Sequence, residues 1–164
     1  MTALKRWMNI YGVRIGINMT EPPTVIVDAD AIIAQANPED KHHQTATTIT
    51  QSLIKINAQV IYPVTAVTEA TAYVQRVLNS TASAYEMTGV FTDPNVHVAE
   101  VNQETLISAL EYYSPKTSKK NTLFDCIVAV IADKYQADAI FSFDKFYKKK
   151  GFKLATDLKF TNKD

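Results

Sequence analysis

The chain has 164 residues, 46% of them hydrophobic and 21% charged, which suits one globular domain with a substantial core. Its 17 lysines and arginines balance 17 aspartates and glutamates, so the chain lacks the basic excess that is typical of a general nucleic-acid binder. The single cysteine, Cys126, excludes an intramolecular disulfide, and no apolar run reaches the roughly 18 residues of a membrane span. We therefore expect a cytoplasmic protein that does not associate with membranes.

Residues 1–23 differ in character from the rest of the chain. Charged residues and two glycines interrupt any signal-like apolar core in the first 18 residues, so we do not expect secretion. Met19 precedes a polar, proline-bearing segment, TEPPT, so that either Met1 or Met19 could be the true start. We predict an N-terminal extension over 1–23, disordered or forming a docking helix, and a single domain over 24–164.

Short apolar strands alternate with amphipathic helices over residues 24–164. In chain order we predict a strand at 24–27, helices at 31–36 and 39–58, a strand at 59–63, helices from Thr65 to Leu78 and at 81–89, a strand at 95–101, a helix at 103–113, a loop at 114–121, a helix at 122–135, and strands at 139–143 and 152–156. This alternation predicts an α/β fold, a three-layer α/β/α sandwich with a mainly parallel central sheet.

Two aspartates follow predicted buried strands directly. Asp28 comes after TVIV and Asp144 comes after AIFSF. Because the carboxyl ends of parallel strands form the ligand crevice of α/β sheets, these two carboxylates are expected to converge.

Two further acids are expected near the same edge. Asp125 is the only charged residue between Asn121 and Ala132, on a helix that otherwise has the composition of a core helix. Glu69 falls in the first turn of the helix after the second strand. A buried carboxylate is costly unless it is paired or binds a cation, and four such acids would repel one another. Mg²⁺ or Mn²⁺, which prefer oxygen ligands, would remove that repulsion.

Each acid also has a purely structural interpretation. Asp28 could cap the first helix, although Asp30 fits that cap better. Asp125 could form a capping box with Thr122, Glu69 could be an ordinary acid of a first helical turn, and Asp144 could be a turn residue.

Four segments together resemble the PIN domain, particularly the VapC-type toxins of prokaryotic toxin–antitoxin pairs: VIVDADAII (25–33), PVTAVTEATAYV (63–74), TLFDCIVAVIA (122–132) and AIFSFDKFYKKKGF (139–152). The resemblance extends from about Thr24 to Ala155 and places the family's acids at Asp28, Glu69, Asp125 and Asp144. It implies an α/β/α sandwich and an Mg²⁺- or Mn²⁺-dependent endoribonuclease that cleaves RNA with a metal-activated water. It also implies a homodimer and a small cognate antitoxin whose tail blocks the site.

Other residues are expected to assist these four acids. Asp30 stands where many family members carry Ser or Asn, and Ser142 stands where Thr is frequent. We expect both to support the metal from outside its ligand set. Arg76, Lys145 and Lys148 are candidate contacts to RNA phosphates, although a solvated run of charge explains the lysines as well. The three histidines, His42, His43 and His97, lack metal-type spacing and are interpreted as surface or strand residues.

Two other functions fit parts of the sequence. A haloacid-dehalogenase-like phosphatase also begins with an apolar strand followed by Asp-x-Asp, which would make Asp28 a nucleophile and Asp30 an acid/base. The single aspartate of FSFDKF and the unused Asp125 count against it. The other alternative is a non-catalytic PIN-fold protein that binds RNA or a partner.

Overall fold

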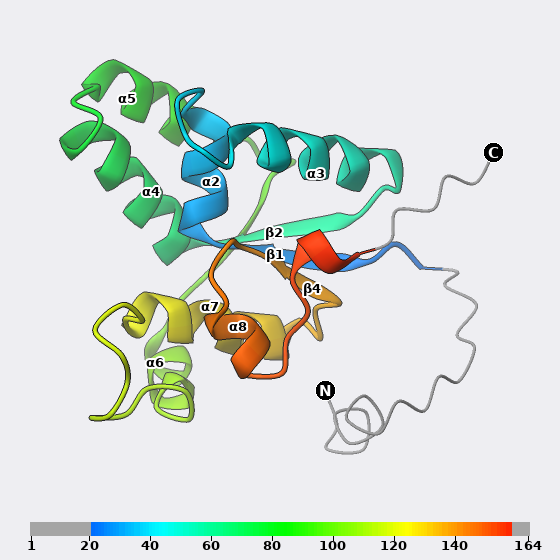
Figure 1. Cartoon of the computed structure of the whole chain (residues 1–164), viewed down its shortest axis with the longest axis vertical. Helices are drawn as coiled ribbons and strands as arrows, with labels where there is room; N and C mark the ends of the chain where they lie inside the picture. Colours follow the sequence, from blue (N-terminus) through cyan, green and yellow to red (C-terminus); the bar gives the residue numbers. More distant parts are fainter. Residues whose placement is uncertain (1–20, 159–164) are drawn as a thin grey trace.

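The computed structural model describes residues 21–158, which form a central sheet of four parallel strands (Figure 1). The strands are β1 (Thr24–Val27), β2 (Gln59–Pro63), β3 (His97–Ala99) and β4 (Ala139–Phe141), in the order β3-β2-β1-β4. Residues 1–20 of the predicted extension, with both candidate start methionines, lie outside the described residues.

Seven α-helices among the described residues cover the two faces of this sheet. One face carries α2 (Ala29–Ala36), α3 (His43–Lys55), α4 (Val64–Arg76) and α5 (Thr81–Val90), and the other carries α6 (Gln103–Ala109), α7 (Leu123–Lys134) and α8 (Phe146–Lys149) (Figure 1). A 3₁₀ turn, η1 (Ala155–Asp157), follows α8. The predicted α/β/α sandwich with a parallel sheet is confirmed. None of the helices within residues 21–158 combines the length and the apolar composition that crossing a bilayer requires.

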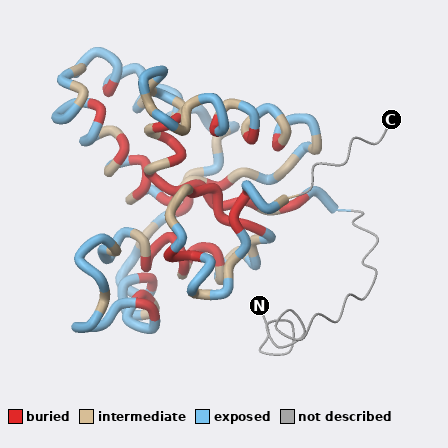
Figure 2. Tube along the Cα trace, in the orientation of Figure 1, coloured by how far each residue is buried: buried red, intermediate tan, exposed pale blue. Residues whose placement is uncertain are grey.

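The core is centred on β1, which lies between β2 and β4. Val25, Ile26 and Val27 have no exposed surface, and buried residues gather along the strands in the middle of the molecule (Figure 2). Ile26 pairs with Ile61 on one side and with Ile140 on the other. This register brings the carboxyl ends of β1, β2 and β4 to one edge of the sheet, where the residues that follow them meet.

Most predicted elements are present, and the differences lie at their ends. The strands at 24–27 and 59–63 have their predicted bounds. The predicted strand at 152–156 is wrong, because only one bridge joins Leu154 to Ile140 before the chain turns into η1. The helix predicted over 39–58 is limited to α3, since a turn at 37–42 precedes it.

α4 begins at Val64, one residue before the predicted start at Thr65, and ends at Arg76, before the predicted end at Leu78. The cap is Pro63, whose φ of −57° suits the entry into a helix, and Thr65 lies inside the first turn. Its hydroxyl oxygen is buried, with no hydrogen-bond partner among the described residues. The predicted strand 95–101 and helix 103–113 are also shorter in the structure, as β3 and α6.

Ile61→Ala is expected to lower the free energy of unfolding by about 2–5 kcal/mol, because it leaves a cavity beside the central strand. Ile61 has no exposed surface, whereas Ile54 on α3 is 69% exposed and provides the matched control. Ile54→Ala should change stability by no more than about 0.5 kcal/mol. Urea unfolding followed by circular dichroism measures both, and equal losses would contradict the assignment of the core.

Candidate active site

Five acids gather around the carboxyl edge of the sheet. Asp28 follows β1, Asp30 lies in the first turn of α2, Asp125 lies in the first turn of α7, and Asp144 follows β4. Glu69 lies in α4 after β2, past the first helical turn in which it was predicted. Their charges affect one another: those of Asp125 and Asp30 raise the pKa of Glu69, after the larger effect of burial. The charge of Asp144 likewise raises the pKa values of Asp30 and Asp125, again after burial. The structure therefore brings together the four predicted ligands and Asp30.

Asp28, not Asp30, caps α2. Its backbone is extended, its Oδ1 accepts a hydrogen bond from the Ala29 amide at 2.7 Å, and its Oδ2 accepts one from the Tyr147 hydroxyl at 2.9 Å. The side chain is nearly buried, with 6% of the residue exposed. Burial raises the pKa of Asp28 well above its usual range, and the charge of Asp30 raises it further. The preference for Asp30 as the cap was wrong, because Asp30 is used elsewhere.

Asp30 ties α2 to the turn that follows β4. Its Oδ2 accepts hydrogen bonds from Ser142 Oγ at 3.0 Å and from the Phe143 amide at 2.8 Å. Ser142 Oγ in turn accepts a hydrogen bond from the Asp144 amide at 3.0 Å. The Oδ1 atom of Asp30 is buried with no hydrogen-bond partner in residues 21–158. Asp30 and Ser142 thus hold the backbone that carries Asp144, which is a supporting position in the site.

Asp125 and Asp144 each have a structural role as well. Asp125 Oδ2 accepts a hydrogen bond from the Thr122 amide at 2.5 Å. This bond completes the capping box of α7, which was one of the two interpretations of Asp125 that the sequence allowed. Asp144 Oδ1 accepts from the Phe146 amide at 2.7 Å, and its Oδ2 accepts from Asn121 Nδ2 at 3.3 Å. Because each carboxylate oxygen has two lone pairs, these bonds fix the side chains without using their full capacity to accept.

The site fits a hard divalent cation by its chemistry. Its donors are carboxylate oxygens, and burial raises the pKa values of Asp28, Asp30, Glu69 and Asp125. The ion pair found within residues 21–158 joins Lys148 to Asp157, so no lysine or arginine of that range forms an ion pair with these acids. The unpaired Oδ1 of Asp30 adds a buried acceptor. In the same range no three acidic, histidine or cysteine side chains already form a group that could hold a metal ion.

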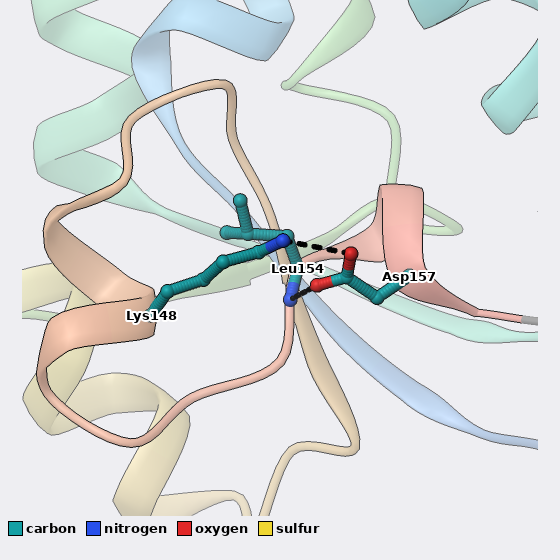
Figure 3. A network of polar contacts seen from close by, with 3 residues as sticks. All are labelled: Lys148, Leu154 and Asp157. Carbon is teal, nitrogen blue, oxygen red and sulfur yellow. Dashed lines mark hydrogen bonds and ion pairs between the residues drawn. The ribbon is translucent and has the colours of Figure 1, made fainter.

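A basic hollow of about 400 Å³ lies beside the acids. Its lining consists of Ser142, Phe143, Lys145, Lys148, Lys149, Leu154 and Thr156. Lys148 pairs with Asp157 at 2.8 Å, and the other oxygen of Asp157 accepts a hydrogen bond from the Leu154 amide at 3.2 Å (Figure 3). Lys145 and Lys149 are exposed. The remaining candidate RNA contact, Arg76, ends α4 roughly 10 Å along the helix axis from Glu69.

Sequence reasoning missed three neighbours of the site. Tyr147 donates to Asp28, Asn121 donates to Asp144, and the His42 ring stacks on Phe143 with centroids 4.1 Å apart. Burial and the charge of Asp28 raise the pKa of Tyr147 well above its usual range, so its hydroxyl remains a neutral donor. The position of Tyr147, three residues after Asp144, was the only sequence signal available.

Comparison with known proteins identifies the class of fold. No family model matches the chain, and no curated protein matches its sequence. Among solved structures the chain is similar to Mycobacterium tuberculosis VapC20, a sarcin–ricin loop cleaving toxin, with a TM-score of 0.68 and 17% sequence identity. The match covers 78% of this chain and 95% of VapC20. The chain therefore has the PIN-like fold, and the predicted resemblance is confirmed at the level of the fold.

Asp28→Asn is expected to stabilise the metal-free protein at about pH 7.5 by about 1 kcal/mol or more, and to lose this benefit near pH 4. The pKa of Asp28 is raised in the folded state, so its contribution to stability is present below the unfolded pKa and is lost as pH rises through the folded pKa. Asparagine imitates the protonated side chain and avoids that loss.

Urea unfolding in EDTA at the two pH values measures this difference. Asp157→Asn is the control, because pairing with Lys148 lowers the pKa of Asp157 and its replacement should bring no gain at neutral pH. An Asp28→Asn variant that is no more stable than the wild type at neutral pH would contradict the repulsive site.

Proposed function

We propose that the protein is an Mg²⁺- or Mn²⁺-dependent endoribonuclease that hydrolyses RNA phosphodiester bonds. The observation that carries this proposal is the cluster of buried and half-buried acids without cationic partners, at the carboxyl edge of a PIN-like sheet. The structural neighbour described as a sarcin–ricin loop cleaving toxin supports the same reaction class.

In this proposal Asp28, Glu69, Asp125 and Asp144 hold the metal. When bound, the metal activates a water for attack and offsets the charge of the phosphodiester. The capping box holds Asp125 at the start of α7, and Asp30 and Ser142 hold the turn that carries Asp144. None of the acids acts as a covalent nucleophile. The bond to Tyr147 and the deep burial of Asp28 count against the phosphatase alternative, in which Asp28 itself would attack.

RNA is proposed to approach the acids over the basic hollow. Lys145 and Lys149 are exposed there and supply positive charge for phosphates. Lys148 supplies less free charge, because it is paired with Asp157, and its main effect is to shape the hollow. Arg76 is proposed as a more distant contact to the strand.

We further propose that the protein is the toxin of a toxin–antitoxin pair, a cytoplasmic homodimer whose site is blocked by a small cognate antitoxin. The fold shared with VapC20 supports this role. A short reading frame beside the gene whose product binds this protein and stops RNA cleavage would be the expected antitoxin.

Asp125→Asn is expected to abolish metal-dependent RNA cleavage and to weaken Mn²⁺ binding, measured by calorimetry and with a pooled RNA substrate. The loss should exceed the roughly 10–100-fold typical of groups that only support a ligand. Asp138→Asn is the matched control, since Asp138 accepts a hydrogen bond from the Thr24 amide at the opposite edge of the sheet. A folded wild type that binds no Mn²⁺ would overturn the nuclease and favour a non-catalytic PIN-fold binding protein.

Replacing Lys145 and Lys149 together with alanine is expected to weaken RNA binding. Fluorescence anisotropy with a single-stranded RNA, performed in EDTA, measures binding without cleavage. The slope of log affinity against log salt should fall by about 1.4, because each lost phosphate contact contributes about 0.7. Lys55 and Lys134, in the last turns of α3 and α7, provide the matched double variant. Equal losses in both double variants would contradict a local RNA site.

A further inference from the structure

Tyr147 is a buried tyrosine whose hydroxyl contacts one of the candidate metal ligands. The hydroxyl donates to Asp28 Oδ2 at 2.9 Å across 119 residues of sequence. Tyr147 has no exposed surface and Asp28 is 6% exposed, so neither group exchanges this bond freely for water. The bond joins α8 to the carboxyl end of β1.

The bond holds Asp28 against the charges around it. Asp30 and Asp125 both act on Asp28 by like-charge repulsion, which favours turning its carboxylate away from the site. Two donors oppose this: the Ala29 amide on Oδ1 and the Tyr147 hydroxyl on Oδ2. Tyr147 supplies the side-chain donor of the two. Each oxygen keeps a second lone pair, so a carboxylate held in this way can still bind a cation.

The same short segment also carries another candidate ligand. Asp144 lies three residues before Tyr147 and accepts a hydrogen bond from the Phe146 amide at 2.7 Å. Asp144 and the group that orients Asp28 are therefore fixed by one turn of chain. A shift of this turn would move both ligands together.

We propose that Tyr147 is a positioning residue that orients the Asp28 carboxylate for a divalent cation. The inference rests on the proposed metal-dependent function and assigns a role to a residue outside the five acids of the site. Groups that orient metal ligands by hydrogen bonds typically change metal affinity by about 10–100-fold when they are removed. The Tyr147 ring contributes separately to the core, where it packs edge to face on Phe146 with centroids 5.2 Å apart.

Tyr147→Phe tests the hydroxyl alone, since the ring is retained. We expect calorimetry to show Mn²⁺ affinity reduced by about 10-fold. RNA cleavage should fall at limiting Mn²⁺ and recover at saturating Mn²⁺, a split that general destabilisation would not produce. Tyr112→Phe is the matched control, because Tyr112 is also a buried tyrosine that donates to a carboxylate, that of Asp133, away from the acids. Its Mn²⁺ affinity should equal that of the wild type.

A measurement on the wild type keeps the inference testable if Tyr147→Phe fails to fold. Tyrosines labelled with ¹³C at Cζ are followed by NMR while Mg²⁺ is added. One buried tyrosine resonance should shift on saturation, because the metal competes for the electron density of its acceptor, and the resonance removed by Tyr112→Phe should not. A spectrum in which no buried tyrosine shifts as Mg²⁺ binds overturns the positioning role.

The outcomes separate this inference from the proposed function. A wild type that binds neither Mn²⁺ nor Mg²⁺ overturns both. A wild type that binds metal, together with a folded Tyr147→Phe of unchanged Mn²⁺ affinity, overturns the positioning role alone. Reduced affinity in Tyr147→Phe and unchanged affinity in Tyr112→Phe support it.

Discussion

The crowding of carboxylates at one edge of a parallel sheet is the constraint on which the rest of the site depends. The register of β1 with its two neighbours brings residues that follow different strands to the same edge. There, burial and like charge both penalise the ionised acids, most of all Asp28. The hydrogen bonds of the site partly offset this cost, because they hold carboxylates that would otherwise turn toward water.

The structural and functional interpretations of these acids do not compete. Asp28 caps α2, Asp125 completes a capping box and Asp144 orders the turn before α8. Each hydrogen bond uses one lone pair of a carboxylate oxygen and fixes the direction of the remaining lone pairs. A residue that begins a helix at the end of a strand is therefore also well placed to hold a cation, which explains why local rules alone could not separate the two roles.

The fold is shared with VapC20 at 17% sequence identity. Similarity of fold at such low sequence identity is expected of a parallel sheet, because its strands are specified by short apolar runs and not by individual residues. Fully buried positions such as Ile26, Ile61 and Ile140 satisfy that requirement with any well-packed apolar side chain. The site on this sheet, by contrast, depends on individual polar contacts such as the hydrogen bond from Tyr147 to Asp28.

The sequence by itself determined the layers, the strands at 24–27 and 59–63 and the position of four acids at one edge of the sheet, because apolar periodicity and lone acids beside buried strands are local signals. Tertiary structure decided the rest. Asp28 and Asp30 are both residue types that favour a helix cap. Asp30 instead accepts hydrogen bonds from the turn after β4, which is distant in sequence, and Asp28 caps the helix. The contact of Tyr147 with Asp28 and the pairing of Lys148 with Asp157 are invisible to local rules for the same reason: each joins residues that meet only once the sheet has formed.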